Sequence, residues 1–61
     1  MRAQSIYNMF CSYCRGLKDD VDYFKSNGNN SIIIFMKNLD RPLRFTVVDV
    51  NRGFWTLEPL G

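Results

Sequence analysis

Apolar residues in the first part of the chain recur at steps of three and four. Between residues 5 and 24 they are Ile6, Phe10, Tyr13 or Cys14, Leu17, Val21 and Phe24. This is the spacing of one helical face, so it predicts an amphipathic helical segment. Gly16 weakens the prediction, because glycine within a helix costs about 1 kcal/mol relative to alanine. A first helix could therefore end at Arg15, with a second helix beginning at Asp19 or Asp20.

A rival interpretation makes residues 21–25 a strand. The polar residues 27–30 would then be the turn across which this strand pairs with the next one along the chain. We favour the helix, because the spacing of three and four continues through Phe24.

The run SIIIFM at residues 31–36 is the strongest strand signal in the chain. Branching at Cβ fits isoleucine to a pleated backbone better than to a helix. The run does not alternate, so apolar side chains leave both faces of the strand. That pattern is typical of a strand that is covered on both sides, or of one whose second face meets a partner.

Two further strands are expected at residues 43–50 and 54–58. Pro42 separates the first of them from the isoleucine run, since proline cannot donate to a ladder. Residues 51–53 read as a three-residue hairpin loop with Gly53 in the left-handed conformation. This loop predicts a register in which the facing pairs are Val50 and Phe54, Asp49 and Trp55, Val48 and Thr56, and Val47 and Leu57.

The predicted register sorts the side chains of these two strands onto two faces. The face expected to meet the helical segment carries Leu43, Phe45, Val47, Trp55 and Leu57. The opposite face carries Arg44, Thr46, Val48, Val50, Phe54, Thr56 and Glu58. One helical segment cannot cover both faces of a sheet. We therefore expect one α+β domain over residues 1–61, in which an N-terminal helical segment packs on a three-stranded antiparallel sheet in the order αβββ.

Length and charge narrow the classes of function. A chain of 61 residues has room for one core, and a domain of this size buries only about 60% of its unfolded surface. Nine aromatic residues partly compensate, because each buries a large area. The net charge of +2 is too small to indicate nucleic-acid binding by itself. No apolar run approaches the length of a membrane span, and with two cysteines a reducing cytoplasm is expected.

Candidate chemistry is sparse. Cys11 and Cys14 form the only recognisable motif, but a structural zinc site needs four ligands and the chain has no histidine. A dimer could supply two ligands from each copy, which is the alternative for a zinc site. We expect two reduced thiols, at least one of them buried, with no metal and no cofactor. The acids Asp19, Asp20 and Asp22 read as a solvated helix start. Without a nucleophile and base in one constellation, an enzyme is not expected.

The surplus apolar area on the second sheet face favours a small interaction module. We expect Val48, Val50 and Phe54 to bind a protein partner or a second copy of the chain, with Arg44 and Arg52 at the rim. Such modules are common among regulators, inhibitors and accessory proteins of bacteria and their phages. The alternative is a small nucleic-acid-binding protein that uses sheet aromatics and the flanking arginines.

Overall fold

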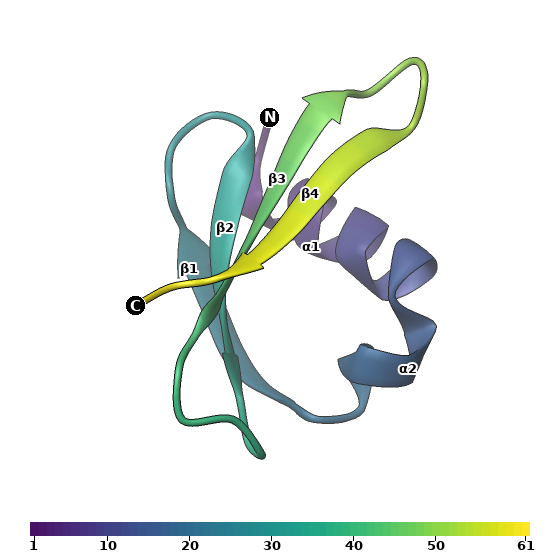
Figure 1. The fold of residues 1–61 in the computed structure, drawn as a ribbon. Coiled ribbons are helices and arrows are strands. Elements are labelled where there is room, and N and C mark those ends of the chain that lie inside the picture. The colour runs from purple at the N-terminus through teal and green to yellow at the C-terminus, as the bar shows by residue number, and fades with distance from the viewer.

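The computed structural model describes all residues 1–61 as two helices followed by four strands. The helices are α1 (Ala3–Tyr13) and α2 (Arg15–Lys18). The strands are β1 (Val21–Ser26), β2 (Ser31–Met36), β3 (Leu43–Asp49) and β4 (Phe54–Pro59). They form one antiparallel sheet in the order β1-β2-β3-β4 (Figure 1). The α+β class with an N-terminal helix is confirmed, and the sheet has four strands instead of three.

The extra strand is β1, so the prediction of a helix through Phe24 is wrong and the rival strand is right. A β-bulge explains the misleading spacing. Val21 pairs with Met36 and Phe24 pairs with Ile34, and the register shifts between Val21 and Tyr23. In a regular strand, residues three apart lie on opposite faces. Asp22 is the extra residue of the bulge, and it brings Val21 and Phe24 onto the same face. Two apolar residues three apart on one face also fit a helix.

The helical segment breaks at Cys14, earlier than Gly16 suggested. Cys14 leaves the helical conformation, with φ −119° and ψ 56°, and lies between α1 and α2. Its N–H still donates to the Phe10 carbonyl at 2.7 Å, and its own carbonyl accepts from Leu17 at 2.9 Å. The second helix is therefore a single turn that contains Gly16. Asp19 and Asp20 do not begin a helix but lead into β1.

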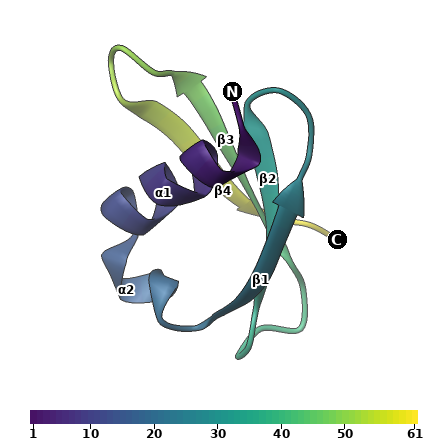
Figure 2. The ribbon, with the colours of Figure 1, turned by 180° about the vertical axis from the view of Figure 1, so that it is seen from behind.

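The core lies between α1 and one face of the sheet, as Figure 2 shows from the helix side. Its fully buried side chains are Ile6, Phe10, Ile32, Ile34 and Phe45. Phe10 meets Phe45 edge to face, with ring centroids 5.5 Å apart, and Tyr7 stacks on Phe24 at 4.2 Å. Aromatic pairs of this kind add about 1 kcal/mol to the burial of their area. No helix of the structure is long and apolar enough to cross a bilayer.

The β3–β4 register differs from the predicted one by two residues along most of the hairpin. Phe45 faces Leu57, Thr46 faces Thr56 and Val47 faces Trp55. A shift of two residues keeps each side chain on its face. Phe45 and Val47 are accordingly buried in the core, and Leu57 packs against it. The predicted faces are thus confirmed for Phe45, Val47 and Leu57, whereas the predicted pairs are wrong. Beyond Val47 the prediction fails, because Asp49 and not Val50 shares the face of Phe54.

Candidate protein-binding surface

The β3–β4 hairpin is shaped by a second bulge and a tightly bonded turn. Asp49, and not Val50, faces Phe54, so Val48 is the additional residue of β3. The Asp49 carboxylate Oδ1 accepts the backbone N–H groups of Asn51 at 3.1 Å and Arg52 at 3.2 Å. The two N–H groups have no partner in the β3–β4 ladder, and the Asp49 carboxylate satisfies them instead, which stabilises the turn.

Gly53 closes this turn in the left-handed conformation that its position predicted. Its φ is +71°, and its N–H donates to the Val50 carbonyl at 3.3 Å. The loop therefore runs from residue 50 to residue 53 and is one residue longer than expected. Gly53 can take this backbone conformation without the steric cost of a Cβ atom.

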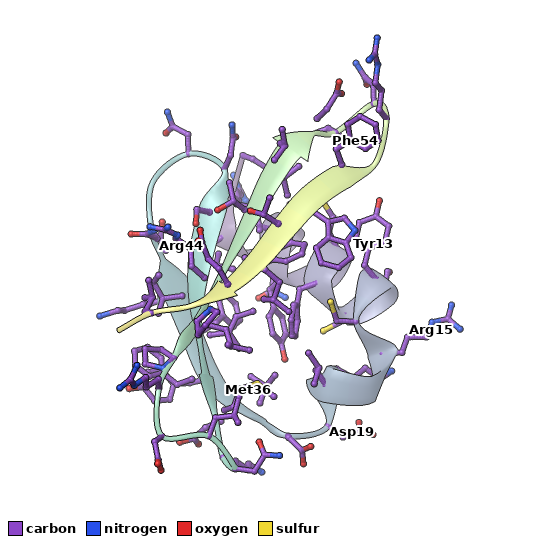
Figure 3. The ribbon with its side chains drawn as sticks, in the orientation of Figure 1. Tyr13, Arg15, Asp19, Met36, Arg44 and Phe54 are labelled. Carbon is purple, nitrogen blue, oxygen red and sulfur yellow. The ribbon has the colours of Figure 1, made fainter.

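Three apolar side chains of the hairpin are left largely uncovered. Val48 is 62% exposed, Val50 is 49% exposed and Phe54 is 56% exposed. We call Val48, Val50 and Phe54 the hairpin patch. Figure 1 shows that the hairpin extends beyond the β1–β2 turn, and Figure 3 places Phe54 near its end. The three apolar residues predicted to bind a partner therefore lie together on one projecting element.

The two arginines predicted at the rim occupy different places. Arg52 lies in the hairpin turn, where its Nε is 3.7 Å from Asp49 Oδ2. Arg44 faces Glu58 across β3 and β4, and its Nη2 is 2.6 Å from Glu58 Oε1. Glu58 is four residues from Phe54 along β4, about 13 Å in an extended chain. Arg52 therefore borders the hairpin patch, and Arg44 does not.

The underside of the hairpin rests on the helix. Trp55 faces the core side and is 36% exposed, less buried than predicted. Its ring lies 5.5 Å from that of Phe45 and is stacked 5.9 Å from that of Tyr13, at the end of α1 (Figure 3). A Cβ atom at Gly53 would lie 3.6 Å from the Tyr13 hydroxyl oxygen. The contacts of Trp55 with Phe45 and Tyr13 brace the hairpin on the helix side, while Val48, Val50 and Phe54 stay exposed.

The outer face of the sheet, which faces away from α1, carries an aromatic pair that the sequence reading missed. Tyr23 faces Phe35, and their rings stack with centroids 4.4 Å apart. Lys25 Nζ lies 5.5 Å from the Phe35 centroid, within reach of a cation–π interaction. The helix predicted through Phe24 includes Tyr23 and so hides this pair. The rival strand at residues 21–25 was the signal that could have found it.

Ile33 belongs to the same outer face, yet it is only 7% exposed. Its ladder neighbours are Lys25 on β1 and Arg44 on β3. Long basic side chains cover apolar surface with their aliphatic stems while their charged ends stay in water. The middle of the outer face is thus largely closed.

Both cysteines are free thiols, and Cys14 is buried as expected for at least one of them. Burial raises the pKa of the Cys14 thiol, and nearby Cys11 raises it further. Because the thiolate is the nucleophilic form, a raised pKa makes Cys14 a poor nucleophile at neutral pH. No three residues of the types that bind metals come together in the structure.

The one hollow in the surface, with a volume of about 280 Å³, lies at the opposite end of the sheet. Its lining residues are Leu39, Asp40, Arg41, Leu43 and Pro59. That lining offers one carboxylate and one guanidinium, with no nucleophile and no second acid for proton transfer.

Comparison of the chain with known family models, curated proteins and solved structures gave no match.

Proposed function

We propose that the protein is a small non-enzymatic binding module that acts by holding another protein through the hairpin patch. The observation that carries this proposal is the exposure of Val48, Val50 and Phe54 on a projecting hairpin. Large exposed apolar residues gathered on one element of a small domain often mark a contact surface. A cytoplasmic regulator or inhibitor that binds a larger protein is the role that fits best.

Phe54 is the expected anchor of the contact. Interfaces draw most of their affinity from a few large side chains that become fully desolvated at their centre. Val48 and Val50 would exclude water around the Phe54 ring. Arg52 lies at the border of the patch, paired with Asp49, and would tune the rate of encounter more than the affinity.

The test uses Phe54→Asp and Val48→Asp in tagged protein recovered from its native host. Because both side chains are exposed, each variant is expected to stay folded and to lose the partner that the wild type retains. Leu39→Asp is the matched control, since Leu39 is also an exposed apolar residue but lies in the β2–β3 loop. Mass spectrometry of nuclease-treated and untreated samples separates protein partners from those held through nucleic acid.

A second copy of the chain is a further outcome of the same test. In that case the wild type sediments as a dimer, and Phe54→Asp sediments as a folded monomer. If both aspartate variants stay folded and keep every interaction, the hairpin patch is surface only and the proposal fails.

A second candidate function, single-stranded nucleic-acid binding, is favoured by Tyr23, Phe35 and Lys25 on the outer face. An exposed aromatic ring beside a cation is a stacking platform for a base. The ion pairs of Arg44 with Glu58 and of Arg52 with Asp49 count against it, because the carboxylate beside each arginine would repel a phosphate. Nucleic-acid affinity would fall steeply with salt and with Tyr23→Ala, whereas a contact through the hairpin patch would respond to neither.

A further inference from the structure

The sheet has two free edges, β1 and β4, and they differ in protection. β1 carries a bulge beside Asp22, and bulges and charges are devices by which natural sheets block the addition of strands. The extra residue of the second bulge lies on β3, so β4 keeps a regular course. β4 also bears no charge before Glu58. Its first half is therefore the open edge of the sheet.

Two residues of β4 direct their backbone hydrogen-bonding groups away from the sheet. The N–H of Leu60 donates to the Pro42 carbonyl at 2.9 Å, in the same register as the β3–β4 ladder. In an antiparallel ladder, bonded and non-bonded pairs alternate. Every second residue back from Leu60, including Thr56, therefore bonds to β3. The N–H and C=O groups of Trp55 and Leu57 point to the free edge.

Helical residues extend past this edge on the core side. Figure 1 shows the end of α1 and all of α2 on the side of β4 that is away from β3. Tyr13 is exposed although it stacks on Trp55, and Leu17 is only half-buried. Leu57 is likewise half-buried. The edge thus combines unpaired backbone groups with apolar side chains that have room for more cover.

We propose that an extended segment of a partner protein adds antiparallel to β4 as a fifth strand. Its backbone would bond to Trp55 and Leu57, and its side chains opposite those two residues would be apolar and lie over Tyr13 and Leu17. Its side chain opposite Thr56 would be polar, because that position faces solvent on the outer face. Main-chain bonds with alternating apolar side chains are the general mode of strand addition.

A second copy of the chain is not the occupant of this edge. Pairing β4 with β4 about a two-fold axis would place both helical layers on the same face of one continuous sheet. The two copies of α1 and α2, each extending past its own β4, would then occupy the same space. A single extended segment without such a helical layer fits the edge.

The inference rests on the proposed function in one respect, namely that the partner is a protein. The probe is a displayed library of random peptides of about twelve residues, long enough to span a strand, selected against the immobilised full chain. We expect the enriched peptides to carry apolar residues at alternate positions. When bound, they should slow amide hydrogen exchange at Trp55 and Leu57 about tenfold or more. Exchange at Phe24 and Ser26, on β1, should not change.

Leu57→Pro is the blocking variant, because it removes an outward N–H group that β3 does not use. Peptide affinity should fall about tenfold, as expected when a backbone bond is lost and the edge is sterically obstructed. Leu57→Val keeps the N–H group and a strand-forming side chain and should bind like the wild type. Exchange on the wild type does not depend on how the variants fold. Absence of enriched peptides, or enriched peptides that leave both amides unprotected, would overturn the inference.

The failure of this inference and that of the proposed function can be told apart. Peptides that lose affinity with Phe54→Asp but do not slow amide exchange at Trp55 and Leu57 would support binding through the hairpin patch and contradict strand addition. Peptides that protect both amides and ignore Val48→Asp would establish the edge independently of the patch.

Discussion

The two faces of the sheet both carry large apolar side chains, and they differ in what covers them. On the helix side, Ile32, Ile34 and Phe45 are fully buried against α1. On the outer face, Ile33 is nearly buried with no element above it, between two long basic neighbours. Phe54, at the hairpin end, has neither kind of cover. Cover by an element marks the core, and cover by neighbouring side chains closes a surface. Absence of both leaves Phe54 open to solvent, which is why the proposed contact is placed there.

The largest effect is expected from the helix side. Phe45→Ala removes a fully buried ring that contacts both Phe10 and Trp55, so it should cost about 3–5 kcal/mol of unfolding free energy. A domain of this size has only about 5 kcal/mol in total, so the variant should be largely unfolded near physiological temperature. Urea denaturation followed by circular dichroism measures the change. If Phe45→Ala keeps the wild-type midpoint, the core has been placed on the wrong face.

A smaller loss is expected for a residue buried by its neighbours. Ile33→Ala should cost about 2 kcal/mol, at the low end for isoleucine, because the adjacent Lys25 and Arg44 side chains can collapse into the space. Val48→Ala, on the uncovered hairpin, should shift the free energy of unfolding by less than about 0.5 kcal/mol. Equal losses for the two variants would show that the outer face is uniformly exposed or uniformly covered.

The hairpin turn itself should be sensitive to backbone strain. Gly53→Ala forces a Cβ atom into a left-handed conformation and should cost about 1 kcal/mol. Gly16→Ala is the matched control, because a Cβ atom there meets nothing within 4 Å and the residue is helical. That control should stabilise the protein by up to about 1 kcal/mol. Opposite signs in thermal denaturation confirm the turn; destabilisation by both would contradict this account of α2.

The smallest change in stability is expected at the proposed anchor. Phe54→Asp alters an exposed side chain and should change the free energy of unfolding by about 0.5 kcal/mol or less. Urea denaturation of Phe54→Asp and Phe45→Ala under the same conditions compares the loss of unfolding free energy at two phenylalanines of one hairpin. An unfolded Phe54→Asp variant would mean that the outer end of the hairpin belongs to a core.

Local pattern predicted most of the sheet but not its first strand. The isoleucine run, the left-handed Gly53 and the helix-facing side of β3 and β4 all follow from residue type and alternation. β1 did not, because its bulge places Val21 and Phe24 on one face at a spacing that also fits a helix. Bulges depend on pairing with a distant strand, so periodicity within one segment cannot reveal them.

The sequence predicted the apolar residues of the candidate surface but not the ion pair and the aromatic pair elsewhere on the sheet. Val48, Val50 and Phe54 are apolar residues that alternation assigns to the face that one helix leaves uncovered. The structure shows all three exposed, although the bulge at Val48 gives the place opposite Phe54 to Asp49. The pairing of Arg44 with Glu58 depends on a register that the hairpin loop alone did not give, because the turn is one residue longer and the bulge at Val48 shifts the ladder by one more. The Tyr23–Phe35 pair requires β1, so a prediction without that strand could not include it.

The strand order has a consequence for the speed of folding. Each ladder joins strands that are consecutive along the chain, through loops of four to six residues. Closing such short loops costs little chain entropy, so the strands of the meander can pair one after another along the chain. The contact between Phe10 and Phe45 spans most of the chain and can form only when α1 docks. Docking of the first helix onto a largely assembled meander is therefore the step expected to set the folding rate.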